Sequence, residues 1–145
     1  MAGCKVLLDT SGQCLKEGIK AGPDIVKPNR KELEFLAGRT LPDLEAVKAQ
    51  ARKLLAYGVS KVVVSLGSEG LLYVDEEQEL FQGAKAVKVV NTVGCGDTVV
   101  ASLCMSELDL DEPEITLQKA VALAAANAMN GESGKVSVED YIELL

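Results

Sequence analysis

The chain has 145 residues, 48% of them hydrophobic, and a formal net charge of −7. A chain of this length can bury one hydrophobic core but hardly two, so we expect one domain over residues 1–145. The acidic balance, without a Lys- or Arg-rich run, excludes electrostatic recognition of nucleic acid or anionic lipid. Because apolar runs fall far below the ~20 residues of a bilayer span and no signal-peptide pattern opens the chain, the sequence predicts a cytoplasmic protein without a membrane partner.

Predicted strands and helices alternate over the first half of the chain. Short apolar strands are expected at residues 6–9, 24–27 and 62–66, and helices at residues 11–20, 29–37 and 42–57. Gly38 and Gly58 follow the last two helices as end signals. This alternation predicts parallel strands covered by helices, so the expected fold class is α/β.

The second half begins with a predicted hairpin. Residues 67–70 form a predicted turn, and strands at 71–74 and 79–82 pair across residues 75–78. An apolar strand at residues 87–90 then leads to a glycine-rich turn. Three helices are expected after it: residues 98–106, residues 113–130 ended by Gly131, and a short last helix opened by Ser137 with Asp140 in capping-box position.

The stretch Asn91-Thr-Val-Gly-Cys-Gly-Asp-Thr98 is the most informative part of the sequence. Gly94 and Gly96 let the backbone approach a ligand closely, and the amides at the start of a helix suit negative charge. Asp97 lies beside that positive end, where a carboxylate can take a proton from an attacking hydroxyl. The alternative is that Asp97 only caps the helix.

Lys27, Asn29 and Glu32 lie where the second predicted strand gives way to a helix. They place a cation, an amide and a carboxylate at the carboxyl end of a sheet, where α/β folds bind ligands. Asn29 and Glu32 also have the spacing of a capping box, which by itself explains both residues. The two roles can coexist.

Two further features are ambiguous on position alone. Ser65, Gly67 and Gly70 follow a strand and can wrap a nucleotide phosphate or ribose, although hairpin geometry alone also explains such glycines. Asn127 is the only polar side chain in an alanine-rich run, so it bonds either a ligand or the neighbouring backbone.

With these residues in this order, the chain resembles the second half of a ribokinase-like sugar kinase of the PfkB family. The resemblance covers essentially all 145 residues, and the stretch at residues 91–102 is its most specific part. The family's NxxE motif matches Asn29 to Glu32, and its nucleotide loop matches Ser65 to Gly70. Leu8-Asp-Thr-Ser-Gly12 and Lys27-Pro-Asn29 are similar to the branch typified by 1-phosphofructokinase and tagatose-6-phosphate kinase.

The resemblance implies a three-layer, Rossmann-like sheet flanked by helices, truncated to the C-terminal half of the family fold. It implies ATP-dependent phosphoryl transfer to a hydroxyl of a sugar phosphate, with Asp97 as general base and the amides of Gly94, Cys95 and Gly96 as an anion hole. It also implies ATP and Mg²⁺ as cofactors. Glu32 with Asn29 would organise Mg²⁺ through water, and Lys27 would contact the ATP phosphates. The nucleotide would be lined by Ser65, Gly67 and Gly70. Asn127 would lie near its base or ribose.

Two departures from the family pattern shape further expectations. Members of the family are much longer than this chain, so we expect the sugar-binding half and its lid to be absent. The strand at residues 6–8 would then present an unpaired apolar edge, which predicts marginal stability or self-association. Cys95 replaces the more usual alanine or serine; its thiol is either inert packing or a site whose oxidation or alkylation blocks phosphate binding. Because the four cysteines lack CxxC spacing and the chain has no histidine, we expect reduced thiols and no zinc site.

Two alternatives from other classes stay open. A non-catalytic nucleotide-binding module would keep the loops but lack a phosphoryl acceptor, and a purely structural domain would bind no Mg·ATP. The acceptor sugar is also open between tagatose 6-phosphate, fructose 1-phosphate and fructose 6-phosphate, because its determinants would lie mostly in the absent half.

Overall fold

The computed structural model describes residues 3–145. The chain divides into two compact units. The first unit comprises Met1–Leu66 and Leu72–Leu80, and the second comprises Gly67–Leu71 and Phe81–Leu145. The two units are described separately below.

The strands form one sheet whose order follows the chain, β1-β2-β3-β4-β5. Their bounds are β1 Leu7–Leu8, β2 Ile25–Val26, β3 Lys61–Ser65, β4 Gly70–Val74 and β5 Glu79–Gly83. β1 pairs with β2 and β2 with β3 in parallel, with Leu7 opposite Ile25 and Val26 opposite Val62. The parallel strands and their intervening helices confirm the predicted α/β class, and β1 lies at an edge of the sheet.

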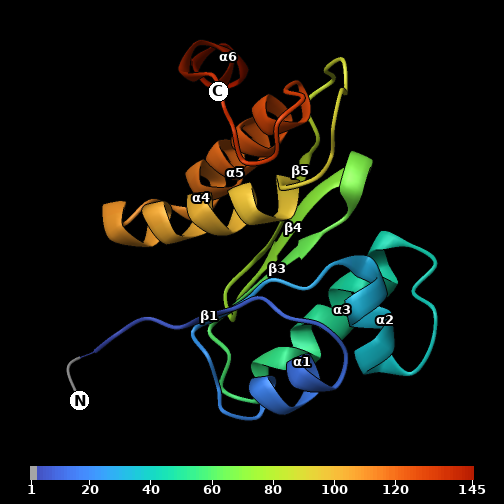
Figure 1. Cartoon of the computed structure of the whole chain (residues 1–145). Coiled ribbons are helices and arrows are strands. Elements are labelled where there is room, and N and C mark those ends of the chain that lie inside the picture. Colours follow the sequence, from blue (N-terminus) through green and yellow to red (C-terminus); the bar gives the residue numbers. More distant parts are fainter. Residues whose placement is uncertain (1–2) are drawn as a thin grey trace. The chain divides into compact units, whose positions relative to one another are not determined.

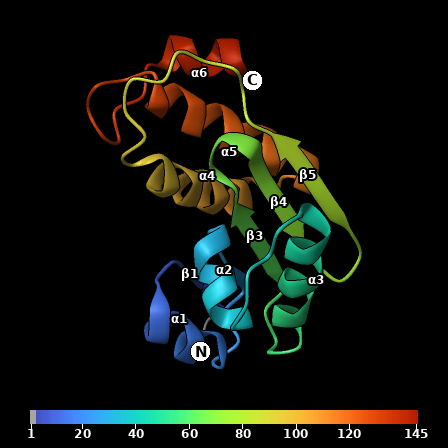
Figure 2. The same cartoon turned by 90° about the vertical axis from the view of Figure 1, so that its right-hand side faces the viewer.

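The first unit contains three helices, α1 Gly12–Ile19, α2 Arg30–Ala37 and α3 Leu44–Leu55, which lie beside one another in Figure 2. α3 begins two residues later than its sequence pattern predicts, because the side chain of Asp43 accepts a hydrogen bond from the amide of Ala46 at 2.8 Å and caps the helix there. α2 ends at Gly38, which adopts the left-handed conformation with φ 66°. Glycine takes this conformation without the steric penalty of a Cβ, so the predicted end signal is confirmed.

The hydrophobic core of the first unit lies between these helices and the strands. Leu15 of α1, Leu33 of α2 and Val47 of α3 are fully buried against strand residues. The strands contribute Val26, Val62, Val64, Leu72 and Val74. Each such side chain contributes roughly 1.5–3 kcal/mol of burial free energy, so this core fixes the strand ends that carry Lys27 and Ser65.

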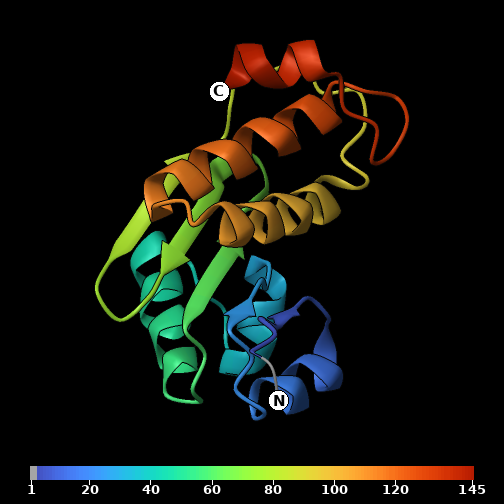
Figure 3. The ribbon, with the colours of Figure 1, turned by 90° about the vertical axis from the view of Figure 1, so that its left-hand side faces the viewer.

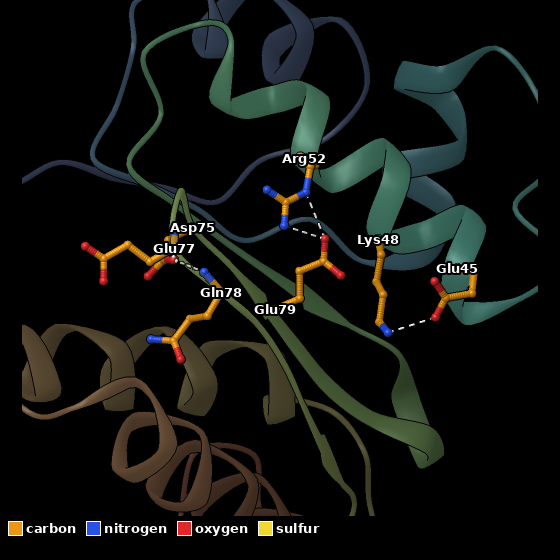
Figure 4. A network of polar contacts seen from close by, with 7 residues as sticks. All are labelled: Glu45, Lys48, Arg52, Asp75, Glu77, Gln78 and Glu79. Carbon is orange, nitrogen blue, oxygen red and sulfur yellow. Dashed lines mark hydrogen bonds and ion pairs between the residues drawn. The ribbon is translucent and has the colours of Figure 1, made fainter.

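A polar network ties α3 to the β4–β5 turn on the surface of the first unit (Figure 4). The guanidinium of Arg52 donates from Nε and Nη2 to Oε1 of Glu79 at 2.8 and 2.5 Å. At the turn, Oδ1 of Asp75 accepts hydrogen bonds from the amides of Glu77 and Gln78, both at 2.8 Å. Because these groups are partly exposed, we expect the network to set the turn's geometry more than to stabilise the fold.

The second unit contains α4 Cys95–Asp109, α5 Pro113–Ala128 and α6 Val138–Leu144. α4 and α5 lie side by side in Figures 1 and 3, with Val99 and Leu103 of α4 and the alanine-rich face of α5 buried. Alanines let two helix backbones approach closely. As predicted, the Ser137 side chain accepts from the amide of Asp140 at the start of α6. No helix within residues 3–145 is long and apolar enough to cross a membrane.

Two sequence predictions about the segment before α4 are wrong. Residues 87–90 form no strand, and Val89 and Val90 are exposed. The amides of Val90 and Asn91 instead donate to the carbonyl of Ala128, at 2.7 and 3.1 Å, so the end of α5 takes the place of a partner strand. α4 also begins at Cys95, three residues earlier than predicted, because Gly94 turns the chain directly into the helix.

Candidate functional site

The glycine turn before α4 has a backbone geometry that only glycine suits. Gly94 has φ 86° and ψ −7°, the values of the third residue of a type II turn. The amide of Cys95 donates to the carbonyl of Thr92 at 3.3 Å and closes that turn. A Cβ added to Gly94 would collide with Oγ of Ser133 and lie 3.0 Å from the amide nitrogen of Gly134. Gly94 is therefore required both by its φ and by the space around it.

The first turn of α4 presents amides without acceptors. The first four amides of a helix have no partner within the helix. In α4 the first regular helical bond runs from the amide of Thr98 to the carbonyl of Gly94 at 2.9 Å, so the four amides are those of residues 94–97; of these, the amide of Cys95 donates to Thr92, as described. Within residues 3–145, the amides of Gly96 and Asp97 have no acceptor, nor has that of Gly94 just before them. Of the predicted anion-hole donors, Gly94 and Gly96 are thus open and Cys95 is engaged by a long bond, while Asp97 adds an open amide.

The side chain of Asp97 is exposed on the third residue of α4. In the part of the chain that the structure describes, its carboxylate makes no hydrogen bond or ion pair, and no side chain caps α4. The alternative that Asp97 only caps the helix is therefore wrong. A free carboxylate next to open amides can accept a proton while those amides hold an anion.

Asn127 is fully buried on α5 and bonds to both sides of the glycine turn. Its Nδ2 donates to the carbonyl of Val93 at 3.0 Å and to Sγ of Cys95 at 3.3 Å, and its Oδ1 accepts from the amide of Gly134 at 2.8 Å. The sequence left open whether Asn127 bonds a ligand or its neighbours, and these contacts are bonds to neighbours. Its nucleotide contact stays a prediction.

The thiol of Cys95 is half-buried at the contact between α4 and α5. Its Sγ donates to the carbonyl of Ala124 on α5 at 3.4 Å and receives the bond from Asn127. These contacts fit the packing alternative for this thiol, and the redox alternative stays a prediction.

Lys27, predicted to meet ATP phosphates, is buried and paired in the first unit. It is 5% exposed, and its Nζ lies 3.3 Å from Oδ1 of Asp9. The amide of Lys27 also donates to the carbonyl of Leu8, which ties the end of β2 to the end of β1. No role was predicted for Asp9 by itself, although a carboxylate at the end of a predicted strand was the available signal.

Asn29 and Glu32 form the predicted capping box at the start of α2. The amide of Asn29 donates to Oε2 of Glu32 at 2.8 Å, and the amide of Glu32 donates to Oδ1 of Asn29 at 2.9 Å. Within the described residues, Oε1 of Glu32 makes no hydrogen bond. One oxygen of the carboxylate is therefore used by the helix and the other is open.

Ser65 and Asn29 come from separate motifs, and the structure brings them together. They form a parallel bridge, and the amide of Ser65 donates to the carbonyl of Pro28 at 3.0 Å. The carboxyl ends of β2 and β3 thus lie next to each other, as the α/β pattern predicts.

The two glycines after Ser65 differ in their surroundings. In the second unit, Gly70 has φ 128°, and a Cβ there would collide with the carbonyl oxygen of Gln82 on β5. Hairpin packing alone therefore requires Gly70. Gly67, with φ 61°, has open space beside it. A nucleotide role for either glycine stays a prediction.

The loop at Ser133 and Gly134 contacts the glycine turn, a role that no sequence pattern predicted. Both residues lie against Gly94, and Gly134 also bonds Asn127. No sequence signal marks this contact, because it joins segments about 40 residues apart that only the packing of α4 against α5 brings together.

The fold and the two groups of residues define an α/β protein in which a glycine turn at a helix start presents open amides beside a free carboxylate. Residues 2–139 match the model of the pfkB family carbohydrate kinases. The chain is 43% identical over 120 residues to a 1-phosphofructokinase of Escherichia coli strain K12, a match that covers 83% of this chain and 38% of that protein.

Solved structures agree with this match. The crystal structure of phosphofructokinase-2 from Escherichia coli in complex with potassium superposes with a TM-score of 0.89 and 31% identity, over 95% of this chain and 45% of that one. Ribokinase from Thermotoga maritima gives a TM-score of 0.74 and 26% identity, over 84% of this chain and 42% of that one. The chain therefore has a ribokinase-like α/β fold and belongs to the PfkB family of carbohydrate kinases. It spans less than half the length of these relatives.

Proposed function

We propose that this chain provides the ATP-binding and catalytic-base part of a kinase that phosphorylates a sugar phosphate. Membership of the PfkB family supports the reaction class, and the relative named 1-phosphofructokinase supports fructose 1-phosphate as the first acceptor to test. Tagatose 6-phosphate and fructose 6-phosphate are the other acceptors. In this proposal the sugar-binding residues and lid belong to a part of the kinase outside residues 1–145.

Asp97 is the proposed general base. Its carboxylate takes the proton of the acceptor hydroxyl as the hydroxyl oxygen bonds to the γ-phosphorus of ATP, and the bond from that phosphorus to the bridging oxygen breaks to release ADP. The open amides of Gly94, Gly96 and Asp97 donate to the oxygens of the transferred phosphoryl group, with a weaker share from Cys95. Phosphoryl transfer depends mainly on such positioning and charge stabilisation, which this turn supplies.

Glu32 and Asn29 are the proposed Mg²⁺ residues. Carboxylate and amide oxygens are hard ligands that suit Mg²⁺, and the open Oε1 of Glu32 fits a role through a water ligand while Oε2 holds the capping box. When bound, the ion would neutralise phosphate charge. No group of three acidic or thiol side chains within residues 3–145 forms a ready-made metal cage, which agrees with a hydrated ion shared with phosphates.

The remaining predicted nucleotide contacts differ in accessibility. Ser65 and Gly67 are proposed to line the nucleotide, and Gly67 has open space beside it. Gly70 is proposed to line the nucleotide in addition to its packing within the hairpin. Neighbouring backbone groups already account for the hydrogen bonds of Asn127. Lys27 would reach ATP phosphates only after its pairing with Asp9 loosens.

The observation that carries the proposal is the free carboxylate of Asp97 beside open amides at the start of α4. Calorimetric titration of the chain with a non-hydrolysable ATP analogue and Mg²⁺ tests it. We expect micromolar binding that Gly96→Val abolishes, because a side chain there obstructs the approach of phosphate to the turn. Absence of binding by a chain that circular dichroism shows to be folded would contradict the proposal.

A non-catalytic nucleotide-binding module is the second candidate, because the open amides of the glycine turn suit a phosphate whether or not a sugar acceptor is bound. Both candidates predict binding of the ATP analogue. They differ in turnover: only the kinase transfers phosphate to a sugar phosphate, measured as ADP release that depends on the acceptor.

We also propose that the kinase acts in the cytoplasm and that β1 pairs with a further strand, from a second copy or another polypeptide. β1 is an edge strand of a parallel sheet, and such edges expose unpaired backbone groups. Light scattering of the chain should show species larger than a monomer, and Leu7→Lys should reduce them; a strictly monomeric chain would contradict pairing with a second copy.

A further inference from the structure

We propose that Asn127 is a positioning residue that fixes the direction of the Gly94 amide and the start of α4, and that it does not contact the nucleotide. The inference rests on the proposed function, because it assigns Asn127 to the anion-binding turn of that site. It replaces the expectation that Asn127 lies near the base or ribose.

The side chain of Asn127 forms hydrogen bonds to the glycine turn on both sides of Gly94. Its Nδ2 bonds the carbonyl of Val93 before the glycine and the thiol of Cys95 after it, at 3.0 and 3.3 Å. Its Oδ1 accepts from Gly134, whose amide nitrogen also bounds the space beside Gly94. With both amide protons and the oxygen engaged and no surface exposed, the side chain has no free group for a ligand.

The bond to Val93 determines where the Gly94 amide points. The peptide between Val93 and Gly94 is planar and trans, so its carbonyl oxygen and its N–H point in opposite directions. A hydrogen bond that holds the oxygen toward Asn127 therefore turns the N–H of Gly94 away from α5. This N–H is one of the open donors proposed for the phosphoryl group.

The same bond selects one turn type over another. Type I and type II turns differ by a rotation of the central peptide, here the one between Val93 and Gly94. Gly94 has the dihedral angles of the type II form, and glycine itself allows both forms. The hydrogen bond from the Asn127 amide thus keeps this peptide in one orientation. In that orientation the amides of Gly94 and Gly96 can donate to the same anion.

Other bonds between the end of α5 and the turn do not replace it. The amides of Val90 and Asn91 donate to the carbonyl of Ala128, and Nδ2 of Asn91 donates to the carbonyl of Gly131 at 3.2 Å. These contacts hold the segment before the turn. Among the described residues, only the Asn127 side chain bonds the carbonyl of Val93.

The test compares Asn127→Leu, which keeps side-chain volume and removes the donors, with Asn130→Leu as the matched control. Asn130 lies just past the end of the same helix, and its side chain makes no hydrogen bond within the described residues. The binding probes are adenosine monophosphate and the non-hydrolysable ATP analogue with Mg²⁺. We expect Asn127→Leu to lower the affinity for the ATP analogue about tenfold or more, because the amides of the turn would no longer be aligned for hydrogen bonds to the charged phosphate. Adenosine monophosphate affinity should change less than about twofold, and Asn130→Leu should change neither. An equal loss of affinity for both probes would overturn the inference and would support a contact between Asn127 and the base or ribose.

Amide hydrogen exchange of the ligand-free chain separates this inference from the proposed function. Asn127→Leu should speed exchange of the Cys95 amide, which closes the turn, about tenfold or more relative to amides within α5. Unchanged exchange would overturn the positioning role. If the unaltered chain fails to bind the ATP analogue, the proposed function fails and exchange alone decides the positioning role.

A measurement on the unaltered chain covers the case in which Asn127→Leu does not fold. The side-chain NH₂ protons of Asn127 should exchange with solvent at least about tenfold more slowly than those of Asn130. Equal exchange would show that the hydrogen bonds of the Asn127 side chain to the glycine turn are not maintained, and it would overturn the inference.

Discussion

The two motifs that the sequence marks as functional satisfy their polar groups in opposite ways. At the start of α2, Asn29 and Glu32 bond each other's backbone amides at 2.8 and 2.9 Å, and nearby Lys27 pairs with Asp9. At the start of α4, the carboxylate of Asp97 and the amides of Gly94, Gly96 and Asp97 have no partners within residues 3–145. At one helix start the capping side chains occupy two amides, and at the other the amides stay open to an anion.

This difference shows what a helix start needs in order to be a site. A capping side chain occupies the amides that would otherwise attract an anion, so a good cap competes with a ligand. Gly94 precedes α4 as a cap residue without a side chain, so the amides of Gly96 and Asp97 stay open. The open amides therefore support the proposed role of Asp97, whereas the capping box already accounts for one oxygen of Glu32.

The largest expected effect is on the base. In a complete kinase that contains this chain, Asp97→Asn should lower kcat for ATP-dependent phosphorylation by roughly 10²- to 10⁴-fold, the usual contribution of a general base. Affinity for the ATP analogue should change much less, because the amides of the turn remain. Steady-state kinetics with calorimetry measures both.

Glu114→Gln is the matched control for Asp97→Asn. Glu114 lies in the first turn of α5, so this variant also removes a carboxylate at a helix start, but one without a glycine turn. It should leave kcat unchanged. Near-normal turnover in Asp97→Asn would remove the base assignment and with it the contrast between the two motifs.

Gly94→Ala should destabilise the fold by about 2–4 kcal/mol, because it combines left-handed backbone strain with a collision against Ser133. Gly38→Ala is the control: Gly38 also has positive φ, at the end of α2, but open space around it. Strain alone should make that change about 1 kcal/mol. Urea denaturation gives both free energies of unfolding, and equal losses would mean that the loop at Ser133 does not restrict the turn.

Glu32→Gln separates the capping box from the Mg²⁺ role. Glutamine keeps both capping hydrogen bonds, so the free energy of unfolding should change by less than about 0.5 kcal/mol. Loss of the charge should weaken the Mg²⁺ dependence of ATP-analogue binding roughly 10- to 100-fold, as for other residues that act through a metal's water. If both quantities stay unchanged, the capping box is the whole role of Glu32.

The sequence was sufficient wherever structure is decided by neighbours along the chain. The capping box, the left-handed Gly38 and the parallel strand ends at Asn29 and Ser65 follow from local spacing and α/β periodicity. In the same way, the glycine turn and Asp97 were found because one contiguous stretch carries them.

The sequence was insufficient where packing decides. Residues 87–90 include three valines and have the pattern of a strand. The amides of Val90 and Asn91 instead bond the carbonyl of Ala128 at the end of α5, and Val89 and Val90 stay exposed. Asn127 looked equally suited to a ligand and to backbone, because its partners Val93 and Gly134 reach it only through the packing of α4 and α5. Local pattern carries no information on such contacts.

The smallest expected effect concerns a carboxylate that is satisfied, at the opposite end of α4 from Asp97. Lys119 on α5 donates to Asp111 at 2.6 Å, and this hydrogen bond lowers the pKa of Asp111 below its ordinary value of 3.8. Because the folded pKa is below the unfolded one, the stabilisation is complete above the ordinary value and is lost as pH falls through the folded pKa. Lys119→Gln should raise the pKa of Asp111 toward 3.8, followed by carboxyl NMR titration, and should lower the free energy of unfolding near neutral pH but not in strong acid. The loss should be small because both side chains are partly exposed to solvent. A loss that persists unchanged in strong acid would show that Lys119 acts through its packing on α5 and not through the Asp111 carboxylate.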